Sequence, residues 1–440
     1  MGIDGLLAFL RELCPEIVQH TKLSDFKGYR IALDLPVLCY QKKSDAISKL
    51  ATKLDLVYED IDYHYCTMFM IKKILGILEN ILYAGAIPVP VFDGTAPKLK
   101  QRTKANRKKK SDNKKDNIEH LRRILRGLLG NTGNRSHEYN KDGTPNTEFV
   151  GFETKVSNLN NSNEPYHLTE FDIAFLRKYE KKRRPVQTID DLKKILLAEI
   201  KQWVVITSHD YLILGTIFST LGIPHVYAQS EAEQTCAQMC KMKDVMAVFT
   251  VDSDCLVYGC PIMINSITLA TGIRVRGQPI VQCYLFSNVL SVLGLTHSQF
   301  IDMCIMFGTD FNDNCDGYGP VKNYQLIKHY GSIKNIEAAR EQLQLKILTA
   351  DKMHSAEKLC LTYDTTILNY DEVRCFFTNP ITYDIKALQI RVLPNQQEHA
   401  FDMLAKIMTV DNFRQIADIC KKLLELLIIA NKGCKHEPIQ

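Results

Sequence analysis

Three short apolar runs in this chain each end in an aspartate. They are 29–33 with Asp34, 87–92 with Asp93, and 245–251 with Asp252. Runs of this length and content are typical of buried strands, and between about Tyr65 and Tyr83 apolar residues recur at the three- and four-residue spacing of a helix. Strands that alternate with helices predict an α/β fold with a mostly parallel sheet flanked by helices.

A fourth apolar run, Trp203–Ile206, predicts a further buried strand, and the residues after about Ser298 predict a largely helical end of the chain. The pattern divides the chain into a first core segment, a very basic helical segment, a second core segment and a helical C-terminal region. The four ranges are 1–97, 98–200, 201–330 and 331–440. The basic segment holds an Asn-rich insertion at about 130–166, which is too poor in apolar residues to order easily and predicts a long mobile loop.

The net charge of the chain is only +5, but it is distributed unevenly. Residues 98–126 hold 13 Lys and Arg against three acidic residues, a local charge of +10, so the remainder carries about −5. A second basic block lies at 177–184. Such blocks fit a solvated helical face, a nuclear-localisation signal or a surface that follows nucleic-acid phosphates, and charge alone does not choose among them.

The composition is that of a soluble globular protein, with 45% hydrophobic and 24% charged residues. No run of 18 apolar residues is present, and the start of the chain lacks the pattern of a signal peptide, so we expect an intracellular protein with no membrane segment. The 14 cysteines include no CxxC pair and stand mostly in apolar surroundings. They are expected to be reduced core residues rather than zinc ligands.

Seven acidic residues stand where an apolar run ends or a helix is predicted to begin. They are Asp34, Asp93, Glu231, Glu233, Asp252, Asp254 and Asp310. Any one of them could simply cap a helix, and Ser230 with Glu233 fits a capping box by itself. Because the carboxyl ends of parallel strands meet along one edge of a sheet, however, the seven are expected to converge on one crevice.

Seven carboxylates in one crevice could not all stay ionised, since like charges in a shared site raise each other's pKa. Bound divalent cations would remove that conflict. The candidate ligands are all oxygens, with no His or Cys among them, which suits Mg²⁺ or Mn²⁺ better than zinc. The set is large enough for two ions, which is the requirement of two-metal phosphoryl chemistry.

Six segments of the chain carry a resemblance to a known family. They are MGIDGLLAFL, KGYRIALDLPVLCYQ, IPVPVFDGTAPKLKQRTKANR, YAQSEAEQTCAQM, FTVDSDCLVYG and CIMFGTDFNDNCDGYGPVKNYQLIKHYG. The most specific signal is the succession SEAE, DSDCL and GTDF, with GYGP following. In this order the segments, which cover roughly half of the chain, resemble the flap-endonuclease branch of the structure-specific 5′ nucleases. Within that branch the chain is most similar to the poxvirus member.

The resemblance implies that the seven carboxylates hold two Mg²⁺ ions, for which Mn²⁺ can substitute. It also implies that Lys100 and Arg107 are catalytic cations at the base of a basic helical arch. Lys100, Lys104 and Arg107 are predicted to share one face of a helix, because seven positions make two helical turns. The family assigns chemistry only to Lys100 and Arg107, so Lys104 is expected to contact the DNA backbone.

Further residues match DNA-contacting positions of the family. They are Gly2, Tyr40, Gly317, Gly319 and Lys322. Tyr40 matches an aromatic residue that stacks on a base near the scissile phosphate, and Gly2 matches a position close to the site. The segment GYGP resembles the hairpin of a helix–two-turn–helix, which in relatives approaches duplex phosphates and also holds K⁺ at the Gly317–Gly319 turn. Without the family, the same segment predicts only a tight turn before a helix.

The implied function is Mg²⁺-dependent cleavage of 5′ flaps or related branched DNA, which leaves a 5′-phosphate and a 3′-hydroxyl. The poxvirus similarity implies cytoplasmic viral DNA replication, repair or recombination, and without it a nuclear location is expected. Two alternatives stay open: a junction-binding protein without activity on the same scaffold, and an RNA-directed metal-dependent nuclease. No sliding-clamp peptide is evident near the C-terminus, and region 331–440 is where a replication-protein partner would bind.

Overall fold

The computed structural model describes residues 2–130, 168–180, 188–268, 279–346, 354–390 and 410–433. Most of the Asn-rich insertion and the end of the second basic block lie outside these residues. The described chain forms two compact units. Unit 1 is built from Met1–Cys39, Ile71–Lys104 and Thr207–Gln440, and unit 2 from Tyr40–Met70 and Ala105–Ile206.

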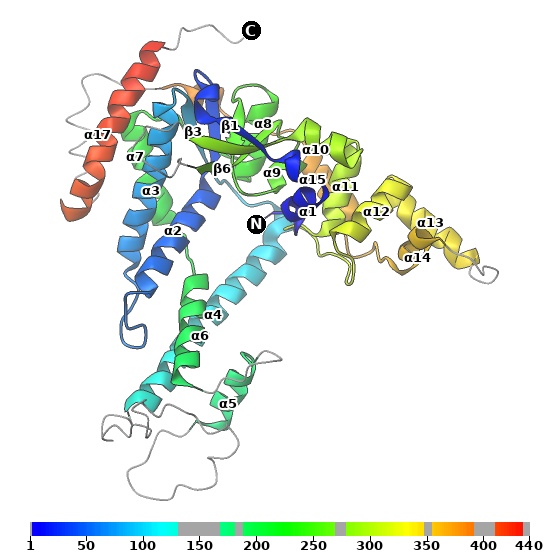
Figure 1. Ribbon diagram of the computed structural model, residues 1–440, viewed down its shortest axis with the longest axis horizontal. Helices are drawn as coiled ribbons and strands as arrows, with labels where there is room; N and C mark the ends of the chain where they lie inside the picture. The colour runs from blue at the N-terminus through cyan, green and yellow to red at the C-terminus, as the bar shows by residue number, and fades with distance from the viewer. Residues whose placement is uncertain are drawn as a thin grey trace, which may run out of the picture. The chain divides into compact units, whose positions relative to one another are not determined.

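Unit 1 contains a seven-stranded sheet (Figure 1). Its strands are β1 (Gln19–Lys22), β2 (Arg30–Asp34), β3 (Ile87–Phe92), β4 (Val226–Tyr227), β5 (Ala247–Phe249), β6 (Ile262–Thr268) and β7 (Ile280–Leu285). The order across the sheet is β1-β7-β6-β5-β2-β3-β4. The strands from β6 to β4 are parallel, whereas β7 pairs antiparallel with both β6 and β1. The predicted mostly parallel α/β sheet is therefore confirmed.

The central strands are buried because their sequences are apolar on both faces. All six residues of β3 are buried, as expected for a parallel strand covered by helices on both sides. Pro88 and Pro90 interrupt this strand and cannot donate ladder hydrogen bonds. They are tolerated because β4 pairs with β3 only beyond them, at Val91 and Phe92.

Helices connect the strands and make up the rest of unit 1. The α-helices within it are α1 (Leu6–Leu13), α7 (Ser208–Leu221), α8 (Ala232–Lys241), α9 (Asp254–Val257), α10 (Phe286–Leu293), α11 (His297–Phe307), α12 (Pro320–Tyr330), α13 (Ile333–Lys346), α14 (Ser355–Thr362), α15 (Tyr370–Thr378) and α17 (Val410–Gly433). Its 3₁₀ helices are η1 (Pro15–Ile17), η2 (Leu23–Phe26), η3 (Lys98–Lys100) and η5 (Ile385–Leu388). The prediction of a largely helical chain after Ser298 is confirmed for the described residues.

Unit 2 is helical. It holds α5 (Glu170–Arg177) and α6 (Ile189–Gln202), and three helices run from one unit into the other: α2 (Leu35–Ala51), α3 (Tyr63–Tyr83) and α4 (Gln101–Gly130). The second half of α4 buries Leu121 and Leu125 against Leu192 and Leu196 of α6. The first half of α4 carries most of its basic residues, and these are mostly exposed.

The strand predicted at Trp203–Ile206 is wrong, because these residues follow α6 without forming a strand. Trp203 packs edge-on against Tyr63 with ring centroids 5.5 Å apart, and its Nε1 donates a hydrogen bond to Ser111 Oγ at 3.2 Å. Trp203 and Val204 pack against the buried cluster of unit 2, whereas Val205 is exposed. Apolar content alone does not distinguish such a segment from a sheet strand.

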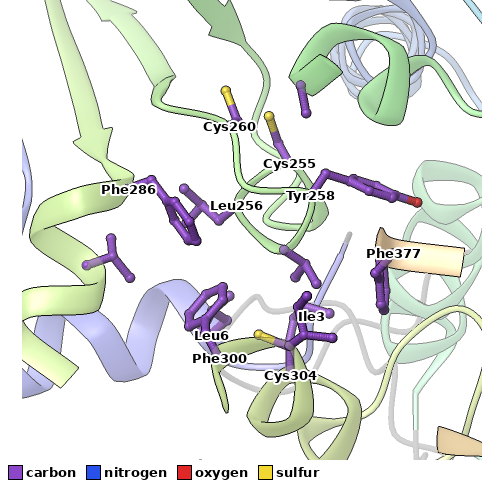
Figure 2. Close-up of a cluster of buried hydrophobic side chains, with 14 of the residues drawn as sticks. Ile3, Leu6, Cys255, Leu256, Tyr258, Cys260, Phe286, Phe300, Cys304 and Phe377 are labelled. Atoms are coloured by element: carbon purple, nitrogen blue, oxygen red, sulfur yellow. The ribbon is translucent and has the colours of Figure 1, made fainter. Parts of the chain in front are cut away.

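A buried hydrophobic cluster in unit 1 joins the start of the chain to the helices near the sheet (Figure 2). Leu6 of α1 lies among Leu256 of α9, Phe286 of α10 and Phe300 of α11. The cluster therefore fixes α9, which begins at Asp254, and the end of α11, which lies three residues before Asp310.

Helices α11 and α12 form the predicted two-helix motif. Gly308 ends α11 with a φ of 98°, a conformation that favours glycine, and α12 begins at Pro320. Asn323 is fully buried between the helices, where its Nδ2 donates to the carbonyl of Met306 at 2.8 Å. The turn between the helices contains Gly317, whose φ is 80°.

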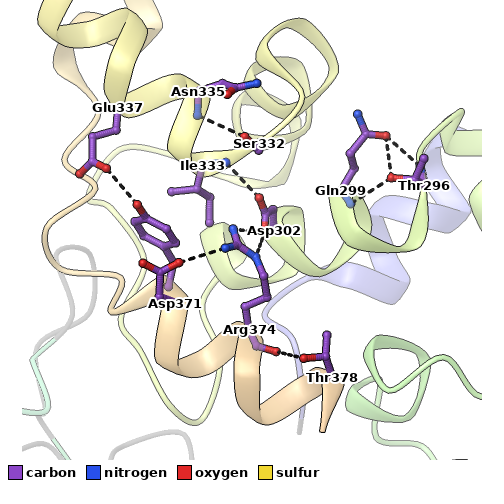
Figure 3. Close-up of polar contacts among 11 residues, drawn as sticks. Thr296, Gln299, Asp302, Ser332, Ile333, Asn335, Glu337, Asp371, Arg374 and Thr378 are labelled. Atoms are coloured by element: carbon purple, nitrogen blue, oxygen red, sulfur yellow. Dashed lines mark hydrogen bonds and ion pairs between the residues drawn. The ribbon is translucent and has the colours of Figure 1, made fainter.

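The helices of the C-terminal region are joined to α11 by a polar network (Figure 3). Asp302 of α11 is buried and accepts hydrogen bonds from Arg374 Nε at 2.8 Å and from the backbone N of Ile333 at 3.0 Å. Arg374 also pairs with Asp371 at 3.1 Å.

Among the described residues no single helix is long and apolar enough to cross a bilayer. Helices α10 and α11 reach that apolar length only when taken together, and they are bent by 81° relative to each other.

Candidate functional site

The seven predicted carboxylates all lie in unit 1, and six of them follow the carboxyl ends of its parallel strands. Asp34 is the last residue of β2, Asp93 follows β3, and Asp252 follows β5. Asp254 is the first residue of α9. The remaining three are Glu231 and Glu233 at the start of α8 and Asp310 after α11. Five of the seven are buried, and Asp93 is exposed at the edge of the group.

Three of these carboxylates are close enough to share one ion. The ligand oxygens of Asp93, Glu231 and Glu233 all lie within 4.8 Å of one another. The backbone N of Ala232 donates to Asp93 Oδ1 at 2.9 Å, which ties the end of β3 to the first turn of α8. Within the described part of the chain, this is the acidic group whose geometry suits a divalent cation.

Asp34 ends β2, the strand that pairs with β3. Its side chain is fully buried, and Thr250 Oγ1 donates to Asp34 Oδ2 at 2.7 Å, while Asp34 Oδ1 has no hydrogen-bond partner. Burial, together with the charges of Asp252 and Asp93, raises the pKa of Asp34 to about 8, although the Thr250 hydrogen bond lowers it.

Asp252 and Asp254 are fixed by the loop that leaves β5. Thr250 Oγ1 accepts a hydrogen bond from the backbone N of Asp252 at 3.0 Å, and Asp252 Oδ1 accepts one from the backbone N of Asp254 at 3.0 Å. Burial raises the pKa of Asp254 well above its ordinary value, and Asp252 and Asp310 add to this effect. Asp254 Oδ1 is buried without a hydrogen-bond partner.

Lys100 is the buried cation of the site. Its Nζ pairs with Glu231 and lies 3.1 Å from Asp310 Oδ2. The centroid of the Phe311 ring lies 5.9 Å from Lys100 Nζ. Burial alone would lower the pKa of Lys100, but the carboxylates of Glu233, Glu231 and Asp310 raise it above its ordinary value. Lys100 is therefore charged and neutralises only part of the acidic group.

The backbone at the start of the chain approaches the carboxylates directly. Gly2 has a φ of 84°, and a Cβ built on it would lie 2.2 Å from Asp252 Oδ1. The backbone N of Ile3 donates to Ser253 Oγ at 2.9 Å, which holds this segment against the loop of Asp252. A side chain at position 2 would thus displace Asp252 or the chain start.

The residues present fit divalent cations. Two buried carboxylate oxygens, Asp34 Oδ1 and Asp254 Oδ1, have no hydrogen-bond partner, although buried polar atoms normally have one. Burial also raises the pKa of Glu233 well above its ordinary value, as do the neighbouring charges of Asp34 and Glu231. Oxygen-only ligands with unbalanced negative charge are the donor set that hard divalent cations prefer.

The raised pKa values of these carboxylates are expected to stabilise the metal-free protein more in mild acid than at higher pH. Asp34 keeps its proton up to about pH 8 when folded, but releases it near pH 4 when unfolded. The folded state therefore binds more protons than the unfolded state between these limits, and the free energy of unfolding is expected to fall as the pH rises through them. Urea unfolding in chelator at about pH 5 and about pH 8 measures this effect.

Saturating Mg²⁺ serves as the comparison in that experiment, because bound cations favour the ionised carboxylates and should reduce the loss of stability at the higher pH. A free energy of unfolding that rises with pH in chelator would show that these carboxylates are ionised in the folded protein without metal.

The structure also corrects two local predictions. Ser230 and Glu233 do not form a capping box, because α8 begins after Glu231 and no side chain caps it. Lys100 is not on one α-helix with Lys104 as predicted, because it lies in η3, directly before α4 begins at Gln101. Lys100 is buried by the carboxylates, whereas Lys104 is exposed.

The remaining predicted residues lie at several places. Arg107 on α4 and Tyr40 on α2 belong to unit 2, and the Tyr40 side chain is exposed. Gly317 and Gly319 lie in the turn before α12, where a Cβ built on either residue would meet nothing within 4 Å. Lys322 Nζ donates to the carbonyl of Gly317 at 2.8 Å and so holds this turn.

Sequence reasoning missed several residues that support the site. Thr250 and Ser253 orient Asp34, Asp252 and the chain start, and their hydroxyls within FTVDSDC were the available signal. Thr103 Oγ1 donates to the carbonyl of Asp310 at 2.5 Å, and this contact between distant segments has no local signature.

Two regions of the chain match known protein families. Residues 1–114 match the XPG N-terminal domain, and residues 222–310 match the XPG I-region. A "Probable RAD2-like endonuclease 369L" from Invertebrate iridescent virus 6 is 25% identical over 339 residues, which cover 76% of this chain and 73% of that protein. Flap endonuclease 1 from Osmerus mordax is 25% identical over 430 residues, covering 97% of this chain and 87% of that protein.

Solved structures share the fold. The catalytic core of Rad2 in complex with DNA substrate superposes with a TM-score of 0.56 at 17% identity, covering 98% of this chain and 100% of that one. Human GEN1 in complex with Holliday junction DNA gives a TM-score of 0.50 at 15% identity, covering 98% of this chain and 78% of that one.

Proposed function

Because the matched XPG regions, the relatives and the fold together support the flap endonuclease-like family, we propose that this chain is a divalent-metal-dependent, structure-specific DNA nuclease. The family's nucleases are hydrolases that act on phosphodiester bonds, and this chain is an enzyme of that class. The metal requirement, the substrate and the biological role are the proposed parts.

The observation that carries the proposal is the acidic group around Lys100. Asp93, Glu231 and Glu233 lie within 4.8 Å of one another, and the remaining four carboxylates follow neighbouring strand and helix ends of the same unit. A set of this size would hold two Mg²⁺ or Mn²⁺ ions. Divalent ions held there would supply a more acidic water and charge stabilisation on phosphate oxygens.

The chain's own residues supply the rest of the mechanism. The buried ammonium of Lys100 adds a fixed positive charge beside the carboxylates, where a scissile phosphate would gain charge in the transition state. Family resemblance adds Arg107 as a second cation and Tyr40 as a stacking ring for the adjacent base. Hydrolysis by water would leave a 5′-phosphate and a 3′-hydroxyl.

The turn before α12 is the proposed contact with duplex DNA. The open space around Gly317 and Gly319 would let a phosphate approach the backbone amides. Lys322 stabilises the turn by donating a hydrogen bond to the carbonyl of Gly317. K⁺ bound at this turn is part of the proposal. The relatives seen with DNA substrate and with Holliday junction DNA support branched or flapped duplexes as substrates.

A role in viral DNA replication, repair or recombination, at a cytoplasmic site, is also proposed. The similarity to the protein of Invertebrate iridescent virus 6 supports a viral role. The earlier resemblance to the poxvirus member stays a prediction, as does a replication-protein partner bound by the C-terminal helices.

The deciding experiment incubates the purified protein with end-labelled 5′-flap, nicked, gapped and Holliday-junction DNA in Mg²⁺ or chelator, with a matched RNA flap beside them. Mg²⁺-dependent incision of a branched DNA is the expected result. Tight binding without incision would instead support the junction-binding alternative, and preferential cleavage of the RNA flap would support the RNA-directed one.

The three arch cations are expected to separate into two classes. Lys104 is exposed, so Lys104→Ala should mainly weaken DNA binding and lower the salt dependence of affinity by about one unit. Lys100→Ala and Arg107→Ala should mainly lower the single-turnover rate at saturating DNA, since they remove charge that acts in the transition state. Single-turnover cleavage of a 5′ flap, with affinity at several salt concentrations, tests this. If Lys100→Ala and Lys104→Ala behave alike on both measurements, Lys100 has no chemical role.

A further inference from the structure

Two adjacent phenylalanines of α15 lie against the loop that carries Asp310. The ring of Phe311 lies 4.7 Å from the ring of Phe376 and 5.6 Å from the ring of Phe377, measured between centroids. Phe311 directly follows Asp310, and its ring also lies 5.9 Å from Lys100 Nζ. The phenylalanine pair therefore packs against the residue that follows Asp310, whose Oδ2 lies 3.1 Å from Lys100 Nζ.

The same pair contacts two other carboxylate-bearing segments. The ring of Tyr258, the residue that ends α9, lies 5.2 Å from the ring of Phe377, and Figure 2 shows Tyr258 and Phe377 in the same buried cluster. Gln234 Nε2, next to Glu233 on α8, donates to the carbonyl of Phe376 at 3.5 Å. Three segments, bearing Asp310, Asp254 and Glu233, thus meet one dipeptide of the C-terminal region.

Polar contacts hold α15 in place on both sides of this dipeptide. Before it, Arg374 is bonded to the buried Asp302 of α11 by Nε at 2.8 Å (Figure 3). After it, Thr382 Oγ1 accepts a hydrogen bond from Gln229 Nε2 at 2.9 Å, and the Tyr383 hydroxyl donates to Asp244 in the loop that follows α8. The segment from Arg374 to Tyr383 is therefore anchored to the elements on which the carboxylates stand.

We propose that Phe376 and Phe377 are positioning residues of the metal centre, and that the C-terminal segment 374–383 completes the site by fixing the spacing of Asp310, Asp254 and Glu233. This inference rests on the proposed function. It assigns to part of region 331–440 a role inside the enzyme itself.

Packing explains why phenylalanines suit this role. A ring is rigid and fills a defined volume, so it fixes its neighbours more closely than a flexible aliphatic side chain does. If the ring of Phe376 or Phe377 is shortened, Phe311 is less tightly packed and can shift. The carboxylate of the preceding residue, Asp310, is then expected to shift with it. A displacement of about 1 Å at a reacting centre can lower a rate by about 10²-fold.

The test replaces each ring by leucine in the full-length protein. Phe377→Leu is the main variant, Phe376→Leu is the milder one because Phe376 is only half-buried, and Phe26→Leu is the matched control. Phe26 is buried, as Phe377 is, but lies in η2, ahead of the amino end of β2, whereas Asp34 stands at the carboxyl end of that strand. All three lose a comparable volume.

Three quantities are measured for each protein: Mn²⁺ affinity by electron paramagnetic resonance, single-turnover cleavage at saturating flap DNA, and DNA affinity in chelator. Phe377→Leu should weaken Mn²⁺ binding and lower the single-turnover rate at least ~10-fold, with unchanged DNA affinity. Phe26→Leu should leave the Mn²⁺ affinity and the single-turnover rate unchanged, even if the melting temperatures of both variants fall equally.

Equal Mn²⁺ affinity in Phe377→Leu and wild type would overturn the inference, as would equal losses in Phe377→Leu and Phe26→Leu. If Phe377→Leu does not fold, the same comparison is made with Phe376→Leu. A wild-type protein that binds Mn²⁺ but cleaves no DNA would refute the proposed function alone, since Mn²⁺ affinity would still decide whether the phenylalanines position the carboxylates.

Discussion

Asp254→Asn is expected to lower single-turnover cleavage of branched DNA by at least ~10²-fold, the lower range for removing a group that stabilises the transition state. Asp254 is buried, its Oδ1 has no hydrogen-bond partner, and it lies among other carboxylates. The amide keeps the shape of the side chain but removes the charge that would attract a divalent ion. The measurement is cleavage at saturating DNA and Mg²⁺, beside Mn²⁺ affinity.

Folding should survive this change. Burial, with the charges of Asp252 and Asp310, raises the pKa of Asp254 well above its ordinary value, so the site without metal already opposes the charge that the substitution removes. DNA affinity in chelator should stay the same or improve, because a negative charge near the phosphates is gone. Asp190→Asn, in the exposed first turn of α6, is the control. Unchanged turnover of Asp254→Asn on every branched substrate would refute the two-metal proposal.

Lys100→Met is expected to lower the free energy of unfolding in chelator by about 3 kcal/mol, the effect of removing one partner from a buried ion pair. Lys100 is buried beside Glu231 and Asp310, and methionine nearly matches its length without its charge. The two carboxylates would then repel each other without compensation. Denaturant unfolding of the variant and the wild type in chelator gives the difference.

Saturating Mg²⁺ should reduce this difference, because bound cations replace part of the missing charge. Lys104→Met is the matched control, since Lys104 is exposed and its loss should change the free energy of unfolding little. If Lys100→Met is as stable as the wild type in chelator, the ion pairs of Lys100 contribute nothing net to folding. A difference that is unaffected by Mg²⁺ would argue against metal binding next to Lys100.

The sequence by itself predicted the three central strands β2, β3 and β5 and the acidic residues that follow them, but not β1, β4, β6 or β7. Asp34, Asp93 and Asp252 follow apolar runs, and in a parallel sheet such residues must lie at one edge, because all the strands point the same way. Hydrophobic periodicity likewise predicted a helix from about Tyr65 to Tyr83, and α3 runs from Tyr63 to Tyr83. These predictions succeed because each depends on local pattern and on one rule of sheet geometry.

Only the tertiary structure decided which residues act together. Lys100 and Lys104 belong to one basic run, yet the first is buried between carboxylates and the second is exposed, since their surroundings come from segments more than a hundred residues away. Trp203–Ile206 has the composition of a strand but packs among helices of unit 2. Phe376 and Phe377 carry no local sign of their contact with Phe311. Burial and ring packing depend on what the rest of the chain brings alongside, and a linear pattern does not contain that information.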